Sequence, residues 1–238
     1  MRLKSILALC RVSNLPTVWM NVITASLIAS SVHGQSMQWG FVAIIAIAIS
    51  AFYAAGMSLN DLCDFTWDKE HQPYRPLVQG KVSLTQAKII TWILFAIGFG
   101  LLAIAPSIKG VIYALVLFAV IYGYNLFHKK YSSSVFLMAS ARALVFVVTA
   151  QALIGELSLW VLAAAGLQFI YTLLLTLVGR YESKRGKPYA GPVIPRMIAG
   201  MAVLDGIVLA ILVAPIWLAL GVSFALLTRF FQRYIRGD

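Results

Sequence analysis

The sequence has few charged residues, and acids are the rarest of them. Of its 238 residues only 11% are charged, with 8 Asp or Glu against 19 Lys or Arg. With 61% hydrophobic residues and a mean hydropathy of +0.87, the chain lacks the polar side chains that would cover a soluble domain. The composition therefore excludes a soluble protein and indicates an integral membrane protein.

Cysteine is nearly absent, which excludes further classes. Cys10 and Cys63 are too few and too far apart for a disulfide framework or a cysteine-based metal site. Low-complexity tracts and long linkers are also missing, so we expect residues 1–238 to form a single transmembrane domain. Strand-like alternation is lacking as well, which argues against a barrel.

Long uncharged stretches recur along the chain, each near the roughly 20 residues that a helix needs to cross about 30 Å of hydrocarbon. We place eight spans and therefore predict an all-α integral membrane protein, with Pro215 separating the last two spans. The spans lie near residues 15–33, 39–59, 86–105, 109–127, 135–154, 157–178, 195–213 and 216–233.

Lysine and arginine concentrate in every second loop, while the intervening loops carry only Lys109. The positive-inside rule then places both termini and the basic loops in the cytoplasm, in a multi-pass protein of the cell (inner) membrane. The net charge of +11 is mostly this orientation signal, which also attracts membrane lipid or a phosphorylated substrate. No soluble basic domain is present, so we expect no nucleic-acid partner.

Half of the acids occur in one segment, residues 60–80 (NDLCDFTWDKEHQPYRPLVQG). Asp61, Asp64 and Asp68 are spaced i, i+3 and i+7, which places them on one face of a helix. Carboxylate oxygens are the ligands that Mg²⁺ prefers. The spacing therefore predicts a face that binds metal and, through the metal, a phosphate.

Neighbouring residues add further binding groups to this segment. Asn60 can orient a carboxylate or supply a carbonyl ligand, and Arg75 can bind a phosphate with a forked set of donors. Pro73 and Pro76 force the following backbone out of the helix. The alternative is a solvated helix end whose acids pair with Lys69 and Arg75, but it does not account for the same-face spacing.

A motif in this segment resembles the first signature of the UbiA superfamily of intramembrane prenyltransferases: Asn60-Asp61-x-x-Asp64-x-x-x-Asp68, then Arg75-Pro76-Leu77 and Gly80. The resemblance covers most of the chain. Arg11 with Asn14 and Pro16 resembles the start of the family's first helix. Two further features, Tyr124-Asn125-x-x-His128-Lys129 with the following Met138 and Arg142 and the short chain, resemble the EboC-like branch.

The resemblance implies a helix bundle around a lipid-facing cavity, where Mg²⁺ on two acidic loops holds an isoprenyl diphosphate. The prenyl group then passes to a hydrophobic, often aromatic acceptor. Asp61, Asp64 and Asp68 would bind Mg²⁺ and, with Lys129, form the catalytic set. Departure of the diphosphate develops negative charge that Mg²⁺ and basic side chains stabilise, leaving an allylic cation in a dry pocket.

The basic loop after the fourth span supplies further candidates. Lys129 can neutralise the diphosphate, and His128 can exchange a proton with the acceptor near neutral pH. Asn125 is a further substrate-binding candidate, and the rings of Tyr124 and Tyr181 can stabilise a cation. The alternatives are that the basic pair only enforces topology and that the aromatic residues only pack.

The family's second acidic motif would fall in residues 179–196, which we expect to form a loop. Here Glu182 is the only acid, so two carboxylates cannot assemble a second Mg²⁺ site. Arg180 and Arg185 can instead bind diphosphate directly. The alternative is a basic loop held near lipid headgroups.

Two charges fall within the spans, Arg142 in the fifth and Asp205 in the seventh, each costing about 2.5–3.5 kcal/mol at a bilayer centre. Arg142 lies near enough to the cytoplasmic end to reach a bound phosphate. The alternatives are a snorkelling Arg142 and an Asp205 that is hydrogen-bonded internally.

The sequence therefore favours a Mg²⁺-dependent prenyltransferase. A UbiA-type membrane terpene cyclase is an enzymatic alternative, and a non-catalytic lipid-binding or transport protein that kept the diphosphate cavity is an alternative of another class. A CDP-alcohol phosphotransferase is disfavoured because the chain lacks a DG-x-x-AR element.

Overall fold

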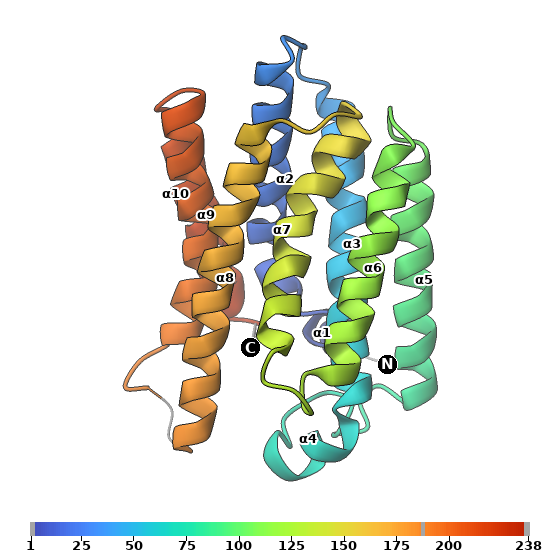
Figure 1. Cartoon of the computed structure of the whole chain (residues 1–238). Coiled ribbons are helices and arrows are strands. Elements are labelled where there is room, and N and C mark those ends of the chain that lie inside the picture. The colour runs from blue at the N-terminus through green and yellow to red at the C-terminus, as the bar shows by residue number, and fades with distance from the viewer. Residues whose placement is uncertain (1–2, 187–188, 236–238) are drawn as a thin grey trace.

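The computed structural model describes residues 3–186 and 189–235, which form a bundle of long helices (Figure 1). Seven of the described helices are long and apolar enough to cross a membrane. They are α2 (Leu15–Val32), α3 (Trp39–Cys63), α5 (Leu84–Ala103), α6 (Lys109–Phe127), α7 (Ser134–Leu153), α8 (Leu159–Arg185) and α9 (Val193–Leu212). An eighth apolar helix, α10 (Trp217–Gln232), has 16 residues.

These eight helices correspond to the eight predicted spans, so the all-α membrane fold is confirmed. The chain turns back between α9 and α10 at Pro215, as predicted. The main difference concerns α8, which continues to Arg185 although the sequence predicts a loop from residue 179 onward. With 27 residues, α8 is about 40 Å long, so its last turns exceed the roughly 30 Å that the hydrocarbon requires.

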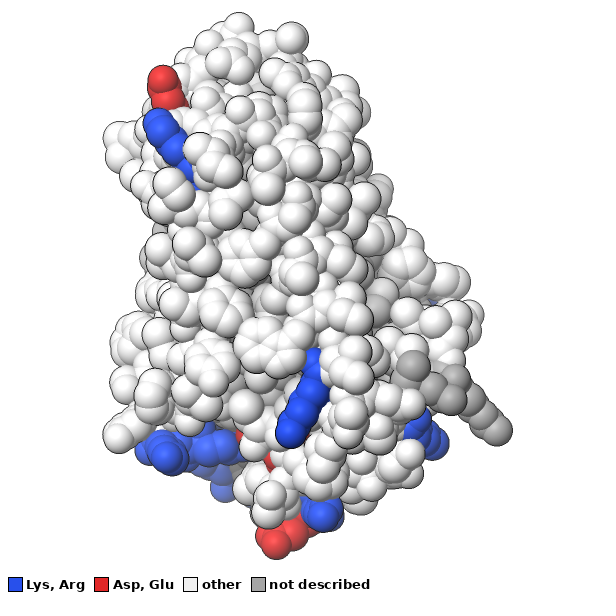
Figure 2. Space-filling model, turned by 90° about the vertical axis from the view of Figure 1, so that its right-hand side faces the viewer, with Lys and Arg blue, Asp and Glu red and all other residues white. Residues whose placement is uncertain are grey.

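Three short helices, α1 (Leu3–Leu9), η1 (Val12–Asn14) and α4 (Phe65–His71), complete the described elements. Figure 1 shows α1, α4 and both termini toward one end of the bundle, which we call the α4 end. Most Lys and Arg side chains on the face in Figure 2 gather at that same end. The α4 helix stops at His71, just before Pro73, as the sequence predicts.

The centre of the bundle is α2, which packs against α3, α7, α8, α9 and α10. The α5 and α6 helices lie outside and expose large apolar side chains such as Trp92 and Leu115. Close approach of α9 and α10 depends on Gly206 and Gly221, because a Cβ on Gly221 would lie 2.6 Å from the Ala202 carbonyl oxygen. An interior cavity lies between these helices, with lining residues from α2, α3, α6, α7, α8 and α9.

Candidate functional site

The predicted acidic segment begins in α3 and continues into α4, with Asp64 at the junction. Helical hydrogen bonds run through this junction, from Asp64 N to Asn60 O at 2.9 Å and from Asp68 N to Asp64 O at 2.8 Å. The side chains of Asp61, Asp64 and Asp68 are all buried. The three carboxylates therefore follow one helical path, as predicted, into the base of the bundle.

Arg75 joins two of these carboxylates. Its Nη1 donates to Asp61 Oδ1 and lies 3.0 Å from Asp68 Oδ2, while its Nε donates to Gln72 Oε1 at 2.6 Å. Arg11 approaches Asp61 from the start of the chain, with Nη2 3.4 Å from Oδ1. Two guanidinium groups therefore balance the charge of this part of the segment.

Asp68 is the least satisfied of the three acids. Its contact with Arg75 lacks hydrogen-bond geometry, and both carboxylate oxygens are buried without a donor in the described part of the chain. Burial raises the pKa of Asp68 to about 6, although the charge of Arg75 opposes this shift. A buried carboxylate without donors suits a bound cation.

Asp64 faces the basic loop between α6 and α7. His128 Nε2 lies 3.0 Å and Lys129 Nζ 3.5 Å from Asp64 Oδ2, and Lys129 Nζ also lies 3.4 Å from the centre of the Trp67 ring. The other ring nitrogen of His128 is 3.2 Å from the Tyr124 carbonyl oxygen. Both nitrogens thus face acceptors, and both contacts are hydrogen bonds only when the imidazole carries two protons.

Two amide side chains also connect α3 to α6. Asn60 Nδ2 donates to Asn125 Oδ1 at 3.1 Å, and Asn125 Nδ2 donates to the Ile121 carbonyl at 2.9 Å. The Tyr124 ring stacks on His128 with centroids 5.0 Å apart. The structure therefore brings the two predicted groups, the acidic segment and the basic loop, into one site.

The basic residues near the end of α8 are arranged differently. Arg180 donates to Ser132 O at 2.6 Å and to Ser134 Oγ at 2.7 Å, at the start of α7. Glu182 Oε1 accepts the Tyr189 N–H at 2.7 Å.

Arg185 lies over two aromatic rings, 5.8 Å from Tyr181 and 5.7 Å from Tyr189. Among the described contacts none joins Tyr181, Glu182 or Arg185 to the acidic segment. Among the described hydrogen bonds, those of Arg180 connect this part of α8 to Ser132 and Ser134, just after the loop residue Lys129.

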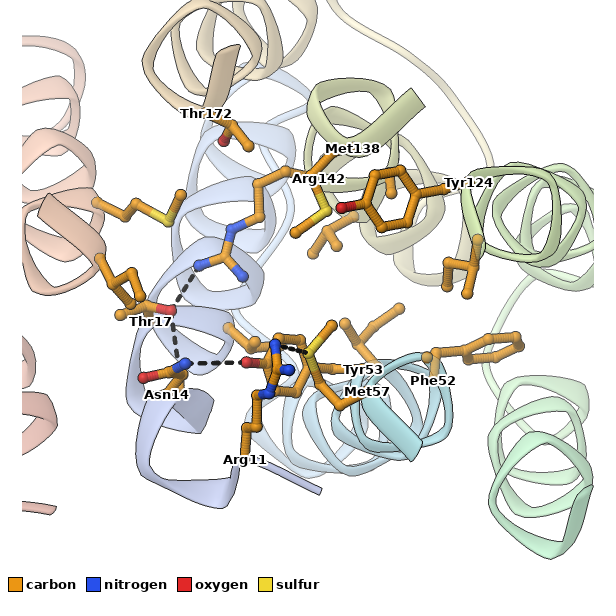
Figure 3. Close-up of a pocket in the computed structure, with 18 of the residues that line it drawn as sticks. Arg11, Asn14, Thr17, Phe52, Tyr53, Met57, Tyr124, Met138, Arg142 and Thr172 are labelled. Atoms are coloured by element: carbon orange, nitrogen blue, oxygen red, sulfur yellow. Dashed lines mark hydrogen bonds between the residues drawn. The ribbon is translucent and has the colours of Figure 1, made fainter. Parts of the chain in front are cut away.

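A cavity of about 260 Å³ lies inside the bundle beside this site. Its wall is mostly aliphatic, with polar groups from Arg11, Asn14, Tyr53, Tyr124 and Arg142, as Figure 3 shows. None of the three aspartates lines it. The cavity provides an apolar volume adjoining a charged end.

A second cavity, of about 240 Å³, lies at the α4 end. Asp61 and Arg75 line it together with Lys4 and Lys81, and Arg11 lines both cavities. The backbone of Arg11 has φ 46° and ψ 46°, a left-handed conformation that is rare for residues other than glycine. Sequence reasoning did not include Arg11 among the site residues, although it is the only basic residue directly before the first span.

The two intramembrane charges have different surroundings. Asp205 accepts hydrogen bonds from Asn21 Nδ2 at 2.5 Å and from Gln168 Nε2 at 2.7 Å, so the internally bonded alternative is confirmed. Arg142 lines the larger cavity and donates to Thr17 Oγ1 at 2.6 Å.

The three carboxylates do not converge on one point. Among the described residues no group of three His, Cys, Asp or Glu side chains is close enough to hold a metal ion, because each aspartate faces a basic side chain. The set Asp61, Asp64 and Asp68 therefore stays a prediction as a metal site. The donor-free oxygens of Asp68 and the neighbouring Asp61 are chemically suited to Mg²⁺.

Together the fold and this site define a multi-pass helical membrane protein with a charged end next to an apolar interior cavity. Comparison with known sequences identifies the class: the model of the UbiA prenyltransferase family matches residues 18–235, and the chain belongs to that family. The EboC-like branch stays a prediction.

Curated relatives match part of the chain. The digeranylgeranylglyceryl phosphate synthase of Saccharolobus solfataricus is 34% identical over 117 residues, which are 49% of this chain and 39% of the relative. The enzyme of the same name from Methanococcus aeolicus is 32% identical over 98 residues, 41% of this chain and 34% of the relative. Each match thus spans less than half the length of the relative.

Solved structures show the same fold over nearly the whole chain. A digeranylgeranylglyceryl phosphate synthase structure matches 98% of this chain and 94% of its own, with a TM-score of 0.63 and 21% identity. A UbiA homolog from Archaeoglobus fulgidus, bound to GPP and Mg²⁺, matches 97% of both chains with a TM-score of 0.62 and 16% identity.

Proposed function

We propose that the protein uses Mg²⁺ to transfer a prenyl group from an isoprenyl diphosphate to a hydrophobic acceptor inside the membrane. The observation that carries this proposal is a buried acidic segment next to an apolar cavity. Both Asp68 oxygens lack a hydrogen bond among the described residues, and Arg11, which pairs with Asp61, also lines the cavity. The relatives named as digeranylgeranylglyceryl phosphate synthases and the homolog bound to GPP and Mg²⁺ support the same chemistry.

Asp61, Asp64 and Asp68 would hold Mg²⁺ at the α4 end. When bound, Mg²⁺ supplies positive charge for the departing diphosphate. Arg75, which already bridges Asp61 and Asp68, would bind the diphosphate with its forked donors. Asn60 would keep the segment aligned through its amide bond to α6.

The second group of residues lies on the basic loop and the end of α8. Lys129 and Arg180 would add positive charge, while His128, whose ring nitrogens face Asp64 and the Tyr124 carbonyl oxygen, would orient Asp64. The ring of Tyr124 lines the cavity, where it would face the allylic cation. The aliphatic wall excludes the water that would otherwise react with this cation.

The sidedness of the protein is part of the proposal. The concentration of Lys and Arg at the α4 end supports a cytoplasmic site with both termini on that side (Figure 2).

A diphosphate-release assay on the purified protein tests this function. Geranyl diphosphate and dimethylallyl diphosphate are supplied with Mg²⁺, with and without a panel of acceptors. We expect Mg²⁺-dependent release and a prenylated acceptor, and we expect Asp68→Asn to remove most of the release.

Glu70→Gln is the matched control, because Glu70 is an exposed acid on the same short helix. Equal release by Asp68→Asn and Glu70→Gln would refute the role of the acidic segment. A cyclic hydrocarbon formed without any acceptor would instead indicate the terpene cyclase, and no Mg²⁺-dependent release would indicate the non-catalytic alternative.

A further inference from the structure

The larger cavity contains a positive charge that no acid contacts. Arg142, on α7, lines this mostly aliphatic cavity, and its one described hydrogen bond goes to the neutral Thr17 hydroxyl at 2.6 Å. Its Nε is buried without a partner among the described residues. Figure 3 shows the guanidinium pointing into the cavity between α2 and the side of α8 that carries Thr172.

The nearest candidate counter-ion is already occupied. Asp205 interacts with Arg142 only at a distance, because the described ion pairs within 4.0 Å do not include these two residues. Both Asp205 oxygens instead accept amide hydrogens, one from Asn21 and one from Gln168. A charge inside a membrane protein normally pairs with an opposite charge or with polar groups, so the unpaired donors of Arg142 indicate a missing anion.

A second unsatisfied group lies on the same cavity wall. The Thr172 hydroxyl, on α8, is buried and has no hydrogen-bond partner among the described residues. Thr17 accepts from Arg142 and donates its own hydrogen to the Asn14 carbonyl at 2.8 Å, so Arg142 and Thr172 supply the free donors on this wall. An oxyanion with two or three oxygen atoms matches such a set, because a guanidinium binds carboxylate or phosphate oxygens in pairs.

These groups lie deeper in the bundle than the proposed diphosphate site. Thr17 is one turn beyond Asn14 on α2, and Asn14 Nδ2 donates to the Tyr53 hydroxyl at 3.1 Å. Tyr53 precedes Asp61 by eight residues on α3, which corresponds to roughly 12 Å along the helix. Arg142 and Tyr53 both line the cavity, whereas none of the three aspartates does.

We propose that Arg142, which Thr17 holds in place, binds together with Thr172 an anionic group of the acceptor, a carboxylate or a phosphate, inside the membrane cavity and apart from the diphosphate site. The inference rests on the proposed function, because it concerns the acceptor of that transfer. It assigns Arg142 to the acceptor rather than to the leaving diphosphate that the sequence suggested.

Binding measurements with matched acid and neutral probes test this subsite. No isoprenyl diphosphate is added, so no turnover occurs. One pair is 4-hydroxyphenylacetate with its methyl ester, and the other is geranylgeranylglyceryl phosphate with geranylgeranylglycerol. The purified protein in lipid nanodiscs should bind the acid of at least one pair more tightly than its neutral counterpart. The pair that shows the difference distinguishes a carboxylate from a phosphate.

Arg142→Gln should weaken binding of that acid roughly 10- to 100-fold, to the level of the neutral probe, because a charge-assisted hydrogen bond is lost. Arg142→Lys should retain part of the preference. The control Arg233→Gln removes an exposed arginine outside the cavity and should bind like the parent. Binding of geranyl diphosphate with Mg²⁺ should be unchanged in Arg142→Gln, which also shows that this variant is folded.

Thr172→Val provides a second variant if Arg142→Gln does not fold. Thr172→Val should lower the affinity for the acidic probe and leave the affinity for the neutral probe unchanged. Equal binding of acid and neutral probes by the parent, in both pairs, would overturn the inference. So would a loss confined to geranyl diphosphate in Arg142→Gln, which would place Arg142 at the diphosphate site. The proposed function fails separately, through the absence of Mg²⁺-dependent diphosphate release by the parent.

Discussion

Arg142 places a fixed positive charge in the same cavity where the allylic cation would form. Two unit charges about 10 Å apart repel by roughly 2 kcal/mol at an effective dielectric constant of about 20. An acceptor that brings an anion to Arg142 removes this repulsion before the donor ionises. Ionisation is then favoured only when the acceptor is present, which protects the diphosphate from unproductive hydrolysis.

Removal of this charge should uncouple donor ionisation from the acceptor. We predict that Arg142→Gln releases diphosphate from geranyl diphosphate about tenfold faster than the parent when Mg²⁺ is present and acceptor is absent. Phosphate-coupled detection of diphosphate measures this rate, with Arg142→Lys as the charge-retaining control. A rate in Arg142→Gln at or below the parent rate would show that the arginine does not restrain ionisation.

The end of α8 is joined to the start of α7 by hydrogen bonds from Arg180. Arg180 donates two hydrogen bonds to the start of α7, whereas Arg185 lies over tyrosine rings. We predict that Arg180→Ala weakens Mg²⁺-dependent diphosphate binding about tenfold, since it loses both its charge and the anchor of the loop that follows Lys129. Arg185→Ala should change the affinity by less than about twofold.

Titration calorimetry with geranyl diphosphate compares the two variants directly. An equal loss in both would mean that the basic end of α8 acts only through its overall charge.

The close packing of α9 against α10 predicts opposite effects for two glycine substitutions. A Cβ at Gly221 would lie 2.6 Å from the Ala202 carbonyl and 2.7 Å from Gly206 Cα, so Gly221→Ala should destabilise the protein by about 1–3 kcal/mol. A Cβ at Gly166, on α8, would meet no neighbouring helix or side chain within 4 Å, so Gly166→Ala should stabilise slightly. Thermal unfolding in detergent micelles measures both, and a stabilised Gly221→Ala would contradict this packing.

At the level of elements, the sequence predicted positions better than contacts. Hydropathy placed all eight long helices because the bilayer sets their length, and Pro215 marked the turn between α9 and α10. The hydropathy pattern predicted too early an end for α8, because residues 179–185 are polar. Helical hydrogen bonding nevertheless continues through this polar sequence to Arg185. Charge alone ends a span but does not end a helix.

The partners of the acids were harder to predict from the sequence. The spacing of Asp61, Asp64 and Asp68 indicated a shared helical path, and the structure shows that all three side chains are also buried. Their contacts with Arg11 and His128 join residues 50 and 64 positions apart, which no local pattern encodes. The left-handed conformation of Arg11 likewise results from the packing of η1 and is not signalled by glycine.

Lys and Arg side chains on the face shown in Figure 2 gather mostly toward the α4 end, and this asymmetry leads to a topological prediction. Figure 1 places both termini and α4 at the same end, while the turn between α2 and α3 lies at the other. The positive-inside rule then puts the α4 end in the cytoplasm. A reporter fused after Asp238 should therefore behave as cytoplasmic.

Cysteine labelling tests the two ends in one background that lacks Cys10 and Cys63. Gln35→Cys, in the exposed α2–α3 turn, should react with an impermeant maleimide added to intact cells. Ser133→Cys, exposed in the loop before α7, should react only after the membrane is opened. The two positions lie on opposite sides because α3, α5 and α6 each cross the bilayer between them, and an odd number of crossings changes the side. Labelling of both cysteines from the same side would therefore contradict the spans, and reversed labelling would place the site on the outer face.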